Sequence, residues 1–100
     1  MTPTLERDIE QKLRCRVEAH GGLCLKWVCP GWAGVPDRIV LLPGGRVCFV
    51  ETKRPKGGRL SALQRKWHEK LTAKGFRVYV VWRQTDLQAF EAAELKEETK

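Results

Sequence analysis

The chain has 100 residues, a net charge of +7 and a pI near 9.6. This length favours one domain over residues 1–100 with a small hydrophobic core. The positive charge favours a polyanionic partner, most often nucleic acid, over a basic protein with no such partner. No apolar run approaches the roughly 20 residues that a transmembrane helix needs, and the polar amino terminus is unlike a signal peptide.

The four cysteines do not have the spacing of a metal site. Cys15, Cys24, Cys29 and Cys48 form no C-x-x-C pair, and only two histidines could join them. A structural zinc domain is therefore disfavoured. Cys15 lies in an expected helix and Cys48 in an expected strand, so we predict that both are small core residues. We expect all four to be reduced thiols in a cytoplasmic protein.

The first expected element is an amphipathic helix. It begins at Thr2-Pro3-Thr4, with threonine as the cap and proline in the first turn, and it ends at Gly21-Gly22. An apolar residue recurs at every fourth position, which is typical of a helix with one buried stripe. That stripe consists of Leu5, Ile9, Leu13 and Val17. A first strand is expected over residues 23–28, followed by a loop rich in glycine and proline.

Two further strands, joined by Pro43-Gly44-Gly45, are expected to form a hairpin. A two-residue loop would turn Glu51 away from Asp37, to the other face of the sheet. A three-residue loop instead pairs Leu42 with Arg46 and places Asp37 opposite Glu51 on the same face. Proline suits the first turn position and the last glycine can adopt the left-handed conformation, so the turn residues favour the three-residue loop.

A basic loop over residues 54–59 precedes the second helix. Ser61 is expected to cap that helix, and Ser61-x-x-Gln64 is also the pattern of a capping box. Gly75 is expected to end it. Its predicted buried stripe consists of Leu63, Trp67 and Leu71.

A fourth strand is expected over residues 76–82, and a last helix is expected to begin at a cap formed by Thr85 or Asp86. Leu87, Phe90 and Leu95 are its apolar positions, and the charged end from Glu94 is expected to fray. The predicted order is αβββαβα, an α/β fold with a mixed central sheet flanked by helices.

Three charged residues are expected to converge at one end of the hairpin. Glu51 and Lys53 are two apart in a strand and therefore project from one face, and Asp37 opens the preceding strand. Charged groups at the ends of buried strands are costly unless they are paired or bound to a metal. The pattern indicates phosphodiester cleavage assisted by magnesium or manganese. The alternative is a turn aspartate beside a surface ion pair.

Five basic residues surround these motifs in the sequence and are expected to bind backbone phosphates without reading bases. They are Lys26, Arg38, Arg54, Lys56 and Arg59. The alternative is a solvated basic loop. Trp32 is the aromatic residue best placed for a DNA or dimer contact, and His68 is interpreted as a residue of the helix surface.

The joint pattern resembles the VRR-NUC nucleases, virus-type replication–repair nucleases of the PD-(D/E)XK superfamily. The resemblance runs from Leu5 to about Trp82 and depends on three motifs: Gly34-Val35-Pro36-Asp37-Arg38, Phe49-Val50-Glu51-Thr52-Lys53 and Leu60-Ser61-Ala62-Leu63-Gln64-Arg65-Lys66-Trp67. It implies a restriction-endonuclease-like αβββαβ core and a magnesium- or manganese-dependent DNA endonuclease. It also implies branched or structured DNA as substrate, possible Holliday-junction resolution, a homodimer, and a phage or bacterial setting.

The resemblance assigns roles to the hairpin residues. Asp37 and Glu51 would hold the metal through their carboxylates, and the backbone carbonyl of Thr52 would add a third oxygen. Lys53 would orient or help deprotonate the attacking water and offset phosphate charge.

Residues of the two helices would complete this site. A glutamate of the first helix is implied; Glu6 matches best, and Glu10, one turn later on the same face, remains an alternative. Gln64 would contact the site or the substrate backbone, or would serve only in the capping box.

Two functional hypotheses follow. The first is a structure-specific endonuclease whose two-fold dimer makes two symmetric cuts, with Trp82 and the strand from Phe76 as candidate interface residues. The second is a non-catalytic basic DNA-binding module, against which the intact trio of Asp37, Glu51 and Lys53 argues.

Overall fold

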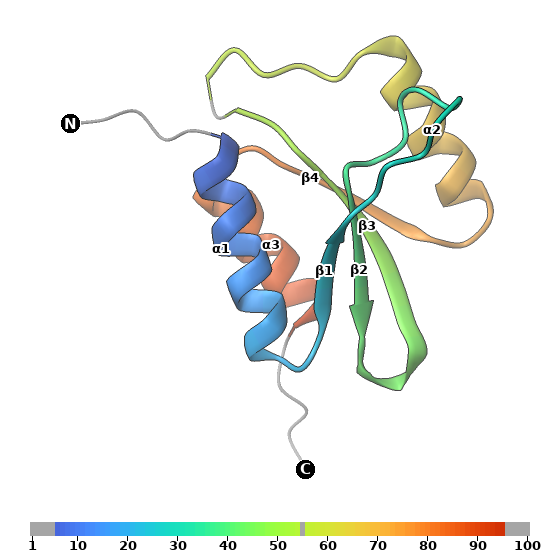
Figure 1. Ribbon diagram of the computed structural model, residues 1–100. Helices are drawn as coiled ribbons and strands as arrows, with labels where there is room; N and C mark the ends of the chain where they lie inside the picture. The colour runs from blue at the N-terminus through green and yellow to red at the C-terminus, as the bar shows by residue number, and fades with distance from the viewer. Residues whose placement is uncertain (1–5, 55, 96–100) are drawn as a thin grey trace.

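The computed structural model describes residues 6–54 and 56–95 (Figure 1). Its elements are α1 (Glu6–Ala19), β1 (Leu23–Lys26), β2 (Arg38–Leu42), the 3₁₀ turn η1 (Pro43–Gly45), β3 (Arg46–Thr52), α2 (Ala62–Ala73), β4 (Arg77–Val81) and α3 (Gln84–Glu94). The predicted order αβββαβα is therefore confirmed. The predicted helix start at residues 2–4 lies outside the described residues.

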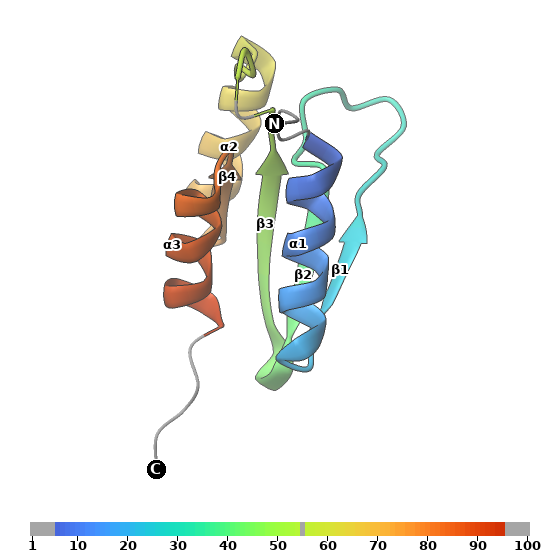
Figure 2. The same ribbon diagram turned by 90° about the vertical axis from the view of Figure 1, so that its left-hand side faces the viewer.

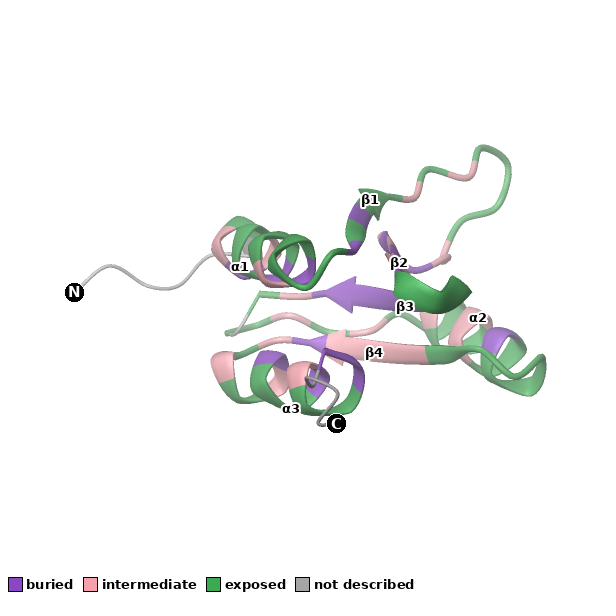
Figure 3. Ribbon diagram, turned by 90° about the horizontal axis from the view of Figure 1, so that it is seen from below, coloured by how far each residue is buried: buried purple, intermediate pink, exposed green. Residues whose placement is uncertain are grey.

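The four strands form one mixed sheet in the order β1-β2-β3-β4. The first two pairings are antiparallel and the pairing of β3 with β4 is parallel. Helices α1 and α3 lie on one side of this sheet and α2 on the other, as Figures 2 and 3 show. Among the described residues, no helix is long and apolar enough to cross a membrane.

The main core fills the space between the sheet and the helices α1 and α3. Because strand side chains alternate, one face of the sheet supplies every second residue of each strand to this core. The core consists of Ile9, Leu13 and Val17 from α1, Cys24, Val40, Leu42, Cys48, Val50 and Val81 from the sheet, and Leu87, Phe90 and Leu95 from the last helix and its end. The apolar spacing of both helices is thus confirmed for the described positions.

All four cysteines are free thiols. Cys48 is buried, as predicted, and burial raises the pKa of its thiol to about 12. The prediction for Cys15 is wrong, because this residue lies on the solvent side of α1 and is exposed. Its position falls between two residues of the buried stripe, Leu13 and Val17, and so on another face of the helix.

The second face of the sheet is only partly covered, because α2 packs mainly against β4. Leu71 is buried in this layer, but Leu63 is 47% exposed, so the predicted buried stripe of the second helix is only partly correct. At the far edge of the sheet, Leu23 and Leu25 of β1 are exposed. This edge therefore carries an uncovered apolar surface.

The β2–β3 hairpin has the predicted three-residue connection. Leu42 pairs with Arg46, and both glycines of the turn are left-handed, with φ of 80° at Gly44 and 75° at Gly45. A side chain at either glycine would be strained in this conformation. The pairing continues to Arg38 opposite Val50, and Asp37 and Glu51 are the next residues beyond this last pair. Their predicted placement on one face stays a prediction, because the Asp37 carboxylate lies against Thr52.

The start of α3 differs from the prediction. The cap is Arg83, and Asp86 is the third residue of the helix. The Asp86 carboxylate reaches back and accepts hydrogen bonds from the backbone N–H groups of Trp82, at 3.0 Å, and Arg83, at 2.9 Å. The aspartate therefore still stabilises the helix start, but from inside the first turn.

The prediction that the chain frays from Glu94 onward is wrong for Glu94 itself, which is 3% exposed at the end of α3. Residues 96–100 lie outside the described residues. The Glu94 carboxylate accepts hydrogen bonds from Arg46 at 3.0 Å, from the Tyr79 hydroxyl at 2.5 Å and from Arg77. Burial opposes ionisation, but these hydrogen bonds and the two positive charges outweigh it and lower the pKa of Glu94. The cluster fastens the end of α3 to β3 and β4.

We expect Glu94→Gln to lower the free energy of unfolding by about 2 kcal/mol, since hydrogen bonds from charged donors are lost. A carboxylate with a lowered folded pKa stabilises the fold above its unfolded pKa, and this contribution disappears as the pH falls through the folded pKa. Urea unfolding should therefore show the variant's deficit at pH 7 and its loss on acidification. The matched control is Glu91→Gln, which removes a more exposed ion pair to Arg16 and should cost less than about 1 kcal/mol. Equal effects of the two changes would contradict the assignment.

Candidate active site

The carboxylate of Asp37 lies against Thr52 at the open end of the hairpin. Asp37 ends the loop before β2, and its backbone carbonyl accepts a hydrogen bond from the Trp27 N–H at 2.9 Å. Its side chain accepts hydrogen bonds from the Thr52 N–H at 3.1 Å and from the Thr52 hydroxyl at 2.7 Å. Burial raises the pKa of Asp37 by more than these hydrogen bonds lower it. The carboxylate is thus fixed in place but poorly solvated.

Glu51 is 4% exposed and points to the α2 side of the sheet. Gln64 of α2 donates a hydrogen bond from Nε2 to Glu51 Oε2 at 3.3 Å. The Lys53 ammonium lies 4.0 Å from the same carboxylate, as expected for two residues that share a strand face. The Glu51 carboxylate is therefore oriented by a helix as well as by its own strand.

Gln64 performs both of the roles that the sequence left open. Its backbone N–H donates to the Ser61 hydroxyl at 3.1 Å, and its side-chain oxygen accepts from the Ser61 N–H at 2.9 Å, which is a complete capping box. The side-chain nitrogen of the same amide reaches Glu51. An amide has an acceptor oxygen and a donor nitrogen, so one side chain can serve the helix start and the site together.

His68 also lies beside Glu51, although the sequence indicated a helix-surface residue. Its Nε2 is 3.8 Å from Glu51 Oε1, and its side chain is 14% exposed. Burial, and then the positive charge of Lys53, lower the pKa of His68. The signal in the sequence was the spacing of four residues from Gln64, which places both side chains on one face of α2.

Glu10 is the described glutamate of α1 that reaches the site. Its Oε1 is 3.0 Å from the Thr52 hydroxyl, which is also 2.7 Å from Asp37. A hydroxyl carries one hydrogen and cannot donate fully to two carboxylates at once. Negative charge therefore accumulates around Thr52, and the nearby Glu10 charge contributes to the raised pKa of Asp37. The side chain of Glu6, the other predicted glutamate, lies outside the described residues.

Arg38 is a structural partner of the site in this geometry. It is 8% exposed, and its guanidinium donates to Glu10 Oε2 at 3.1 Å. A second nitrogen lies 3.5 Å from the Cys24 carbonyl. The Arg38 guanidinium, which the sequence predicted to bind phosphate, is thus already paired with the Glu10 carboxylate.

The other predicted phosphate-binding residues, Lys26, Arg54, Lys56 and Arg59, are exposed. Lys26 lines a cleft of about 280 Å³ together with Arg7 and Arg14 of α1, and Glu10 lies in its wall. Trp32 is 60% exposed and makes an edge contact with Trp67 of α2, with ring centres 5.9 Å apart. The basic surface thus extends to both sides of the hairpin end.

The donor set at the hairpin end fits a hard divalent cation. Two poorly solvated carboxylates, Asp37 and Glu51, flank a strand end whose backbone supplies further oxygen, and such oxygens are the ligands that magnesium prefers. Within residues 6–54 and 56–95, no three side chains of His, Cys, Asp or Glu converge closely enough to hold an ion by themselves. A bound ion would therefore depend on the Thr52 carbonyl and on water, and magnesium commonly keeps several waters.

A mixed sheet with acidic residues at the end of its central hairpin is typical of a nuclease domain. The VRR-NUC domain family matches residues 3–85 of this chain. A solved structure of a VRR_NUC domain is 31% identical and superposes with a TM-score of 0.82, covering 87% of this chain and 94% of that one. The chain belongs to the VRR-NUC family.

A curated relative agrees with this assignment. It is the protein named "Putative nuclease p44" of Acyrthosiphon pisum secondary endosymbiont phage 1. The two sequences are 43% identical over 76 residues, which cover 76% of this chain and 81% of the relative. The resemblance inferred from the three motifs is therefore confirmed at the level of the family.

We expect Arg38→Met to lower the free energy of unfolding by about 2 kcal/mol. The change leaves the partly buried Glu10 without its cation, and Glu10 keeps enough water contact to hold the cost below that of a fully buried pair. The matched control is Lys26→Met, since Lys26 pairs directly with Arg38 across the two strands and is exposed. It should change stability by less than about 0.5 kcal/mol in the same urea titration. A stability loss confined to Lys26→Met would refute the structural role of Arg38.

Proposed function

We propose that this chain is a metal-dependent DNA endonuclease that hydrolyses phosphodiester bonds of branched or structured DNA. The observation that carries the proposal is the pair of poorly solvated carboxylates, Asp37 and Glu51, at the open end of one hairpin, with the Lys53 ammonium 4.0 Å from Glu51. Membership of a nuclease family and the name of the phage relative support the same activity.

Magnesium or manganese is the proposed cofactor. Asp37, Glu51 and the Thr52 carbonyl would hold it, and the bound ion would lower the pKa of a water molecule and polarise the phosphoryl oxygen. Asp37 is fixed for this purpose by two hydrogen bonds from Thr52, and Glu51 by the Gln64 amide. Neither carboxylate therefore has to be reoriented when the substrate binds.

Lys53 is the proposed electrostatic partner of the substrate. Its ammonium already lies 4.0 Å from Glu51, and it would offset the charge of the scissile phosphate and orient or help deprotonate the attacking water. Glu10 is the proposed helix carboxylate of the site, because it shares the Thr52 hydroxyl with Asp37. Glu6 remains a sequence-based hypothesis.

DNA would be held by the exposed basic residues Lys26, Arg54, Lys56 and Arg59. The net charge of +7 and their location around the hairpin end support backbone contacts without base recognition. A non-catalytic DNA-binding module would use the same charges, so cleavage separates the two functions. The free thiols and the phage relative support action in the reducing cytoplasm of a bacterium or phage-infected cell.

A homodimer is proposed as the working assembly for a Holliday-junction-like substrate, since a single site cuts one strand and resolution needs two symmetric cuts. Trp82 and the strand from Phe76 stay a sequence-based prediction for its interface. The exposed apolar residues Leu23 and Leu25 on the edge strand β1 support a second interface. A two-fold axis beside this edge would pair it antiparallel with its own copy and cover both leucines.

We expect Asp37→Ala and Glu51→Ala each to abolish magnesium-dependent cleavage while DNA binding survives. Each change removes a proposed ligand without adding negative charge where phosphates would lie. Nicking assays on four-way, flap and linear DNA, with binding measured in EDTA, test both parts. Glu18→Ala, at an exposed position of α1, is the control and should cleave normally. Cleavage near the wild-type rate by either site variant would overturn the metal-site assignment, and a wild type that binds without cutting would favour the binding module.

Light scattering at micromolar concentration should give twice the 11.5 kDa mass of the chain. Leu25→Lys should shift this mass to that of the monomer, because a charge on the edge strand opposes pairing with a second copy. Gln88→Lys adds the same charge at an exposed position of α3 and should leave the dimer intact. A monomeric wild type with normal cleavage would exclude the dimer and favour a simpler nicking or flap nuclease.

A further inference from the structure

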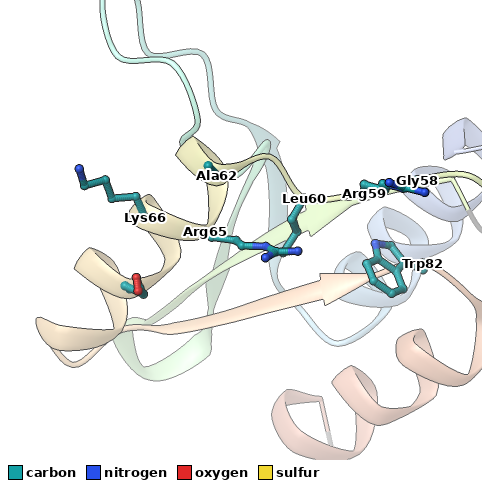
Figure 4. A pocket seen from close by; sticks show the side chains of 8 residues that line it. Gly58, Arg59, Leu60, Ala62, Arg65, Lys66 and Trp82 are labelled. Atoms are coloured by element: carbon teal, nitrogen blue, oxygen red, sulfur yellow. The ribbon is translucent and has the colours of Figure 1, made fainter.

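A second cleft, with a volume of about 610 Å³, lies between α2 and the end of β4 (Figure 4). Arg65 points from α2 towards the cleft, Trp82 forms the opposite wall, and Arg59 lies at the edge beside the indole. Leu60 lies between the two arginines, and Lys66 and Glu69 of α2 belong to the same lining. The volume is that of a site for a small ligand.

This cleft adjoins the candidate active site but uses other residues. The Lys53 N–H donates a hydrogen bond to the Val81 carbonyl at 3.0 Å. The backbones of Lys53 and Trp82 therefore lie one strand spacing apart, about 4.8 Å. Arg65 directly follows Gln64, which contacts Glu51. A strand of DNA with its scissile phosphate at Glu51 would therefore have a neighbouring nucleotide at the cleft.

The two arginines of the cleft are available for a ligand. No ion pair joins Arg59 or Arg65 to an acidic side chain within the described part of the chain. Four other arginines, Arg16, Arg38, Arg46 and Arg77, do form such pairs. Guanidinium groups bind phosphate oxygens in a bidentate geometry, so a free pair beside a cleft favours a phosphate group.

Trp82 supplies the aromatic wall. Its side chain is half-buried and lines the cleft. A planar group could lie against this ring, and a nucleobase stacks on an aromatic side chain. The combination of an indole with two arginines is suited to a base and its phosphate.

We propose that this cleft holds one unpaired nucleotide of the DNA strand being cut, with its base at Trp82 and its phosphate at Arg59 and Arg65. The inference rests on the proposed nuclease function. It would explain how the nuclease distinguishes branched or structured DNA from linear duplex. A base inside a duplex is stacked between its neighbours, and unstacking costs least when the base is already unpaired. The cleft would therefore favour DNA with an unpaired nucleotide near the cut over linear duplex.

The test uses the full chain in EDTA, so that binding is measured without cleavage. The probes are a linear duplex, the same duplex carrying one bulged 2-aminopurine, and the free 2-aminopurine deoxynucleoside monophosphate. The wild type should bind the bulged duplex about tenfold more tightly than the linear one, the effect of one base stacked on an aromatic side chain, and should quench the 2-aminopurine fluorescence. The free nucleotide should bind much more weakly than the bulged duplex.

Arg65→Gln should reduce the tenfold preference to about twofold or less, because a phosphate without its guanidinium partner no longer holds the unpaired base against Trp82. The matched control is Lys74→Gln, which removes the same charge from an exposed residue at the end of α2 that does not line the cleft. It should weaken binding to both duplexes by the same small factor and preserve the preference. Trp82→Phe, a second variant that keeps an aromatic ring, should retain part of the preference and reduce the quenching.

Three results would overturn the inference: no bulge preference in the wild type, equal losses of that preference from Arg65→Gln and Lys74→Gln, or free nucleotide bound as tightly as bulged duplex. The last would indicate a small-molecule site instead of a strand site. If the protein cleaves DNA in magnesium but shows no bulge preference, the proposed nuclease function is supported and the role of the cleft is refuted. If the protein prefers the bulged duplex but cleaves no DNA, the role of the cleft is supported and the nuclease function is refuted.

Discussion

The register of the β2–β3 hairpin is the constraint on which the rest of the site depends. Side chains alternate between the two faces of a sheet, so a slip of one residue would send Glu51 into the α1 side and leave Asp37 without its partner position. The turn of residues 43–45 prevents this slip, because two consecutive left-handed glycines fix Leu42 opposite Arg46. The backbone conformation of this turn thus determines on which face of the sheet Glu51 projects, five residues after Arg46.

Both helical layers are needed to hold the carboxylates. From the α1 side, Glu10 shares the Thr52 hydroxyl with Asp37, and from the α2 side Gln64 orients Glu51. The Gln64 amide also completes the capping box of its helix, so the start of α2 and the position of Glu51 are coupled. The cost of placing poorly solvated carboxylates here is offset by hydrogen bonds from both layers.

Two groups of arginines have different physical roles in this fold. Arg38, Arg46 and Arg77 are ion-paired to glutamates and connect helices to the sheet. Arg59 and Arg65 form no such pairs within the described residues and face a cleft next to the hairpin end. The net charge of +7 is thus a poor guide to which cations are free, since part of the positive charge is used inside the fold.

Local sequence determined the elements, their order and the hairpin register, because helix periodicity, strand alternation and glycine turns act over a few neighbouring residues. The three motifs also identified the family, and the pairing of Leu42 with Arg46 followed from the residues of the turn. Sequence did not reveal that Arg38 is buried against Glu10, that His68 lies beside Glu51 or that Glu94 joins two strands. Those contacts join residues that are distant in the chain, and only the packing of α1, α2 and α3 on the sheet decided which charged side chains would be buried with a partner and which would remain available to a ligand.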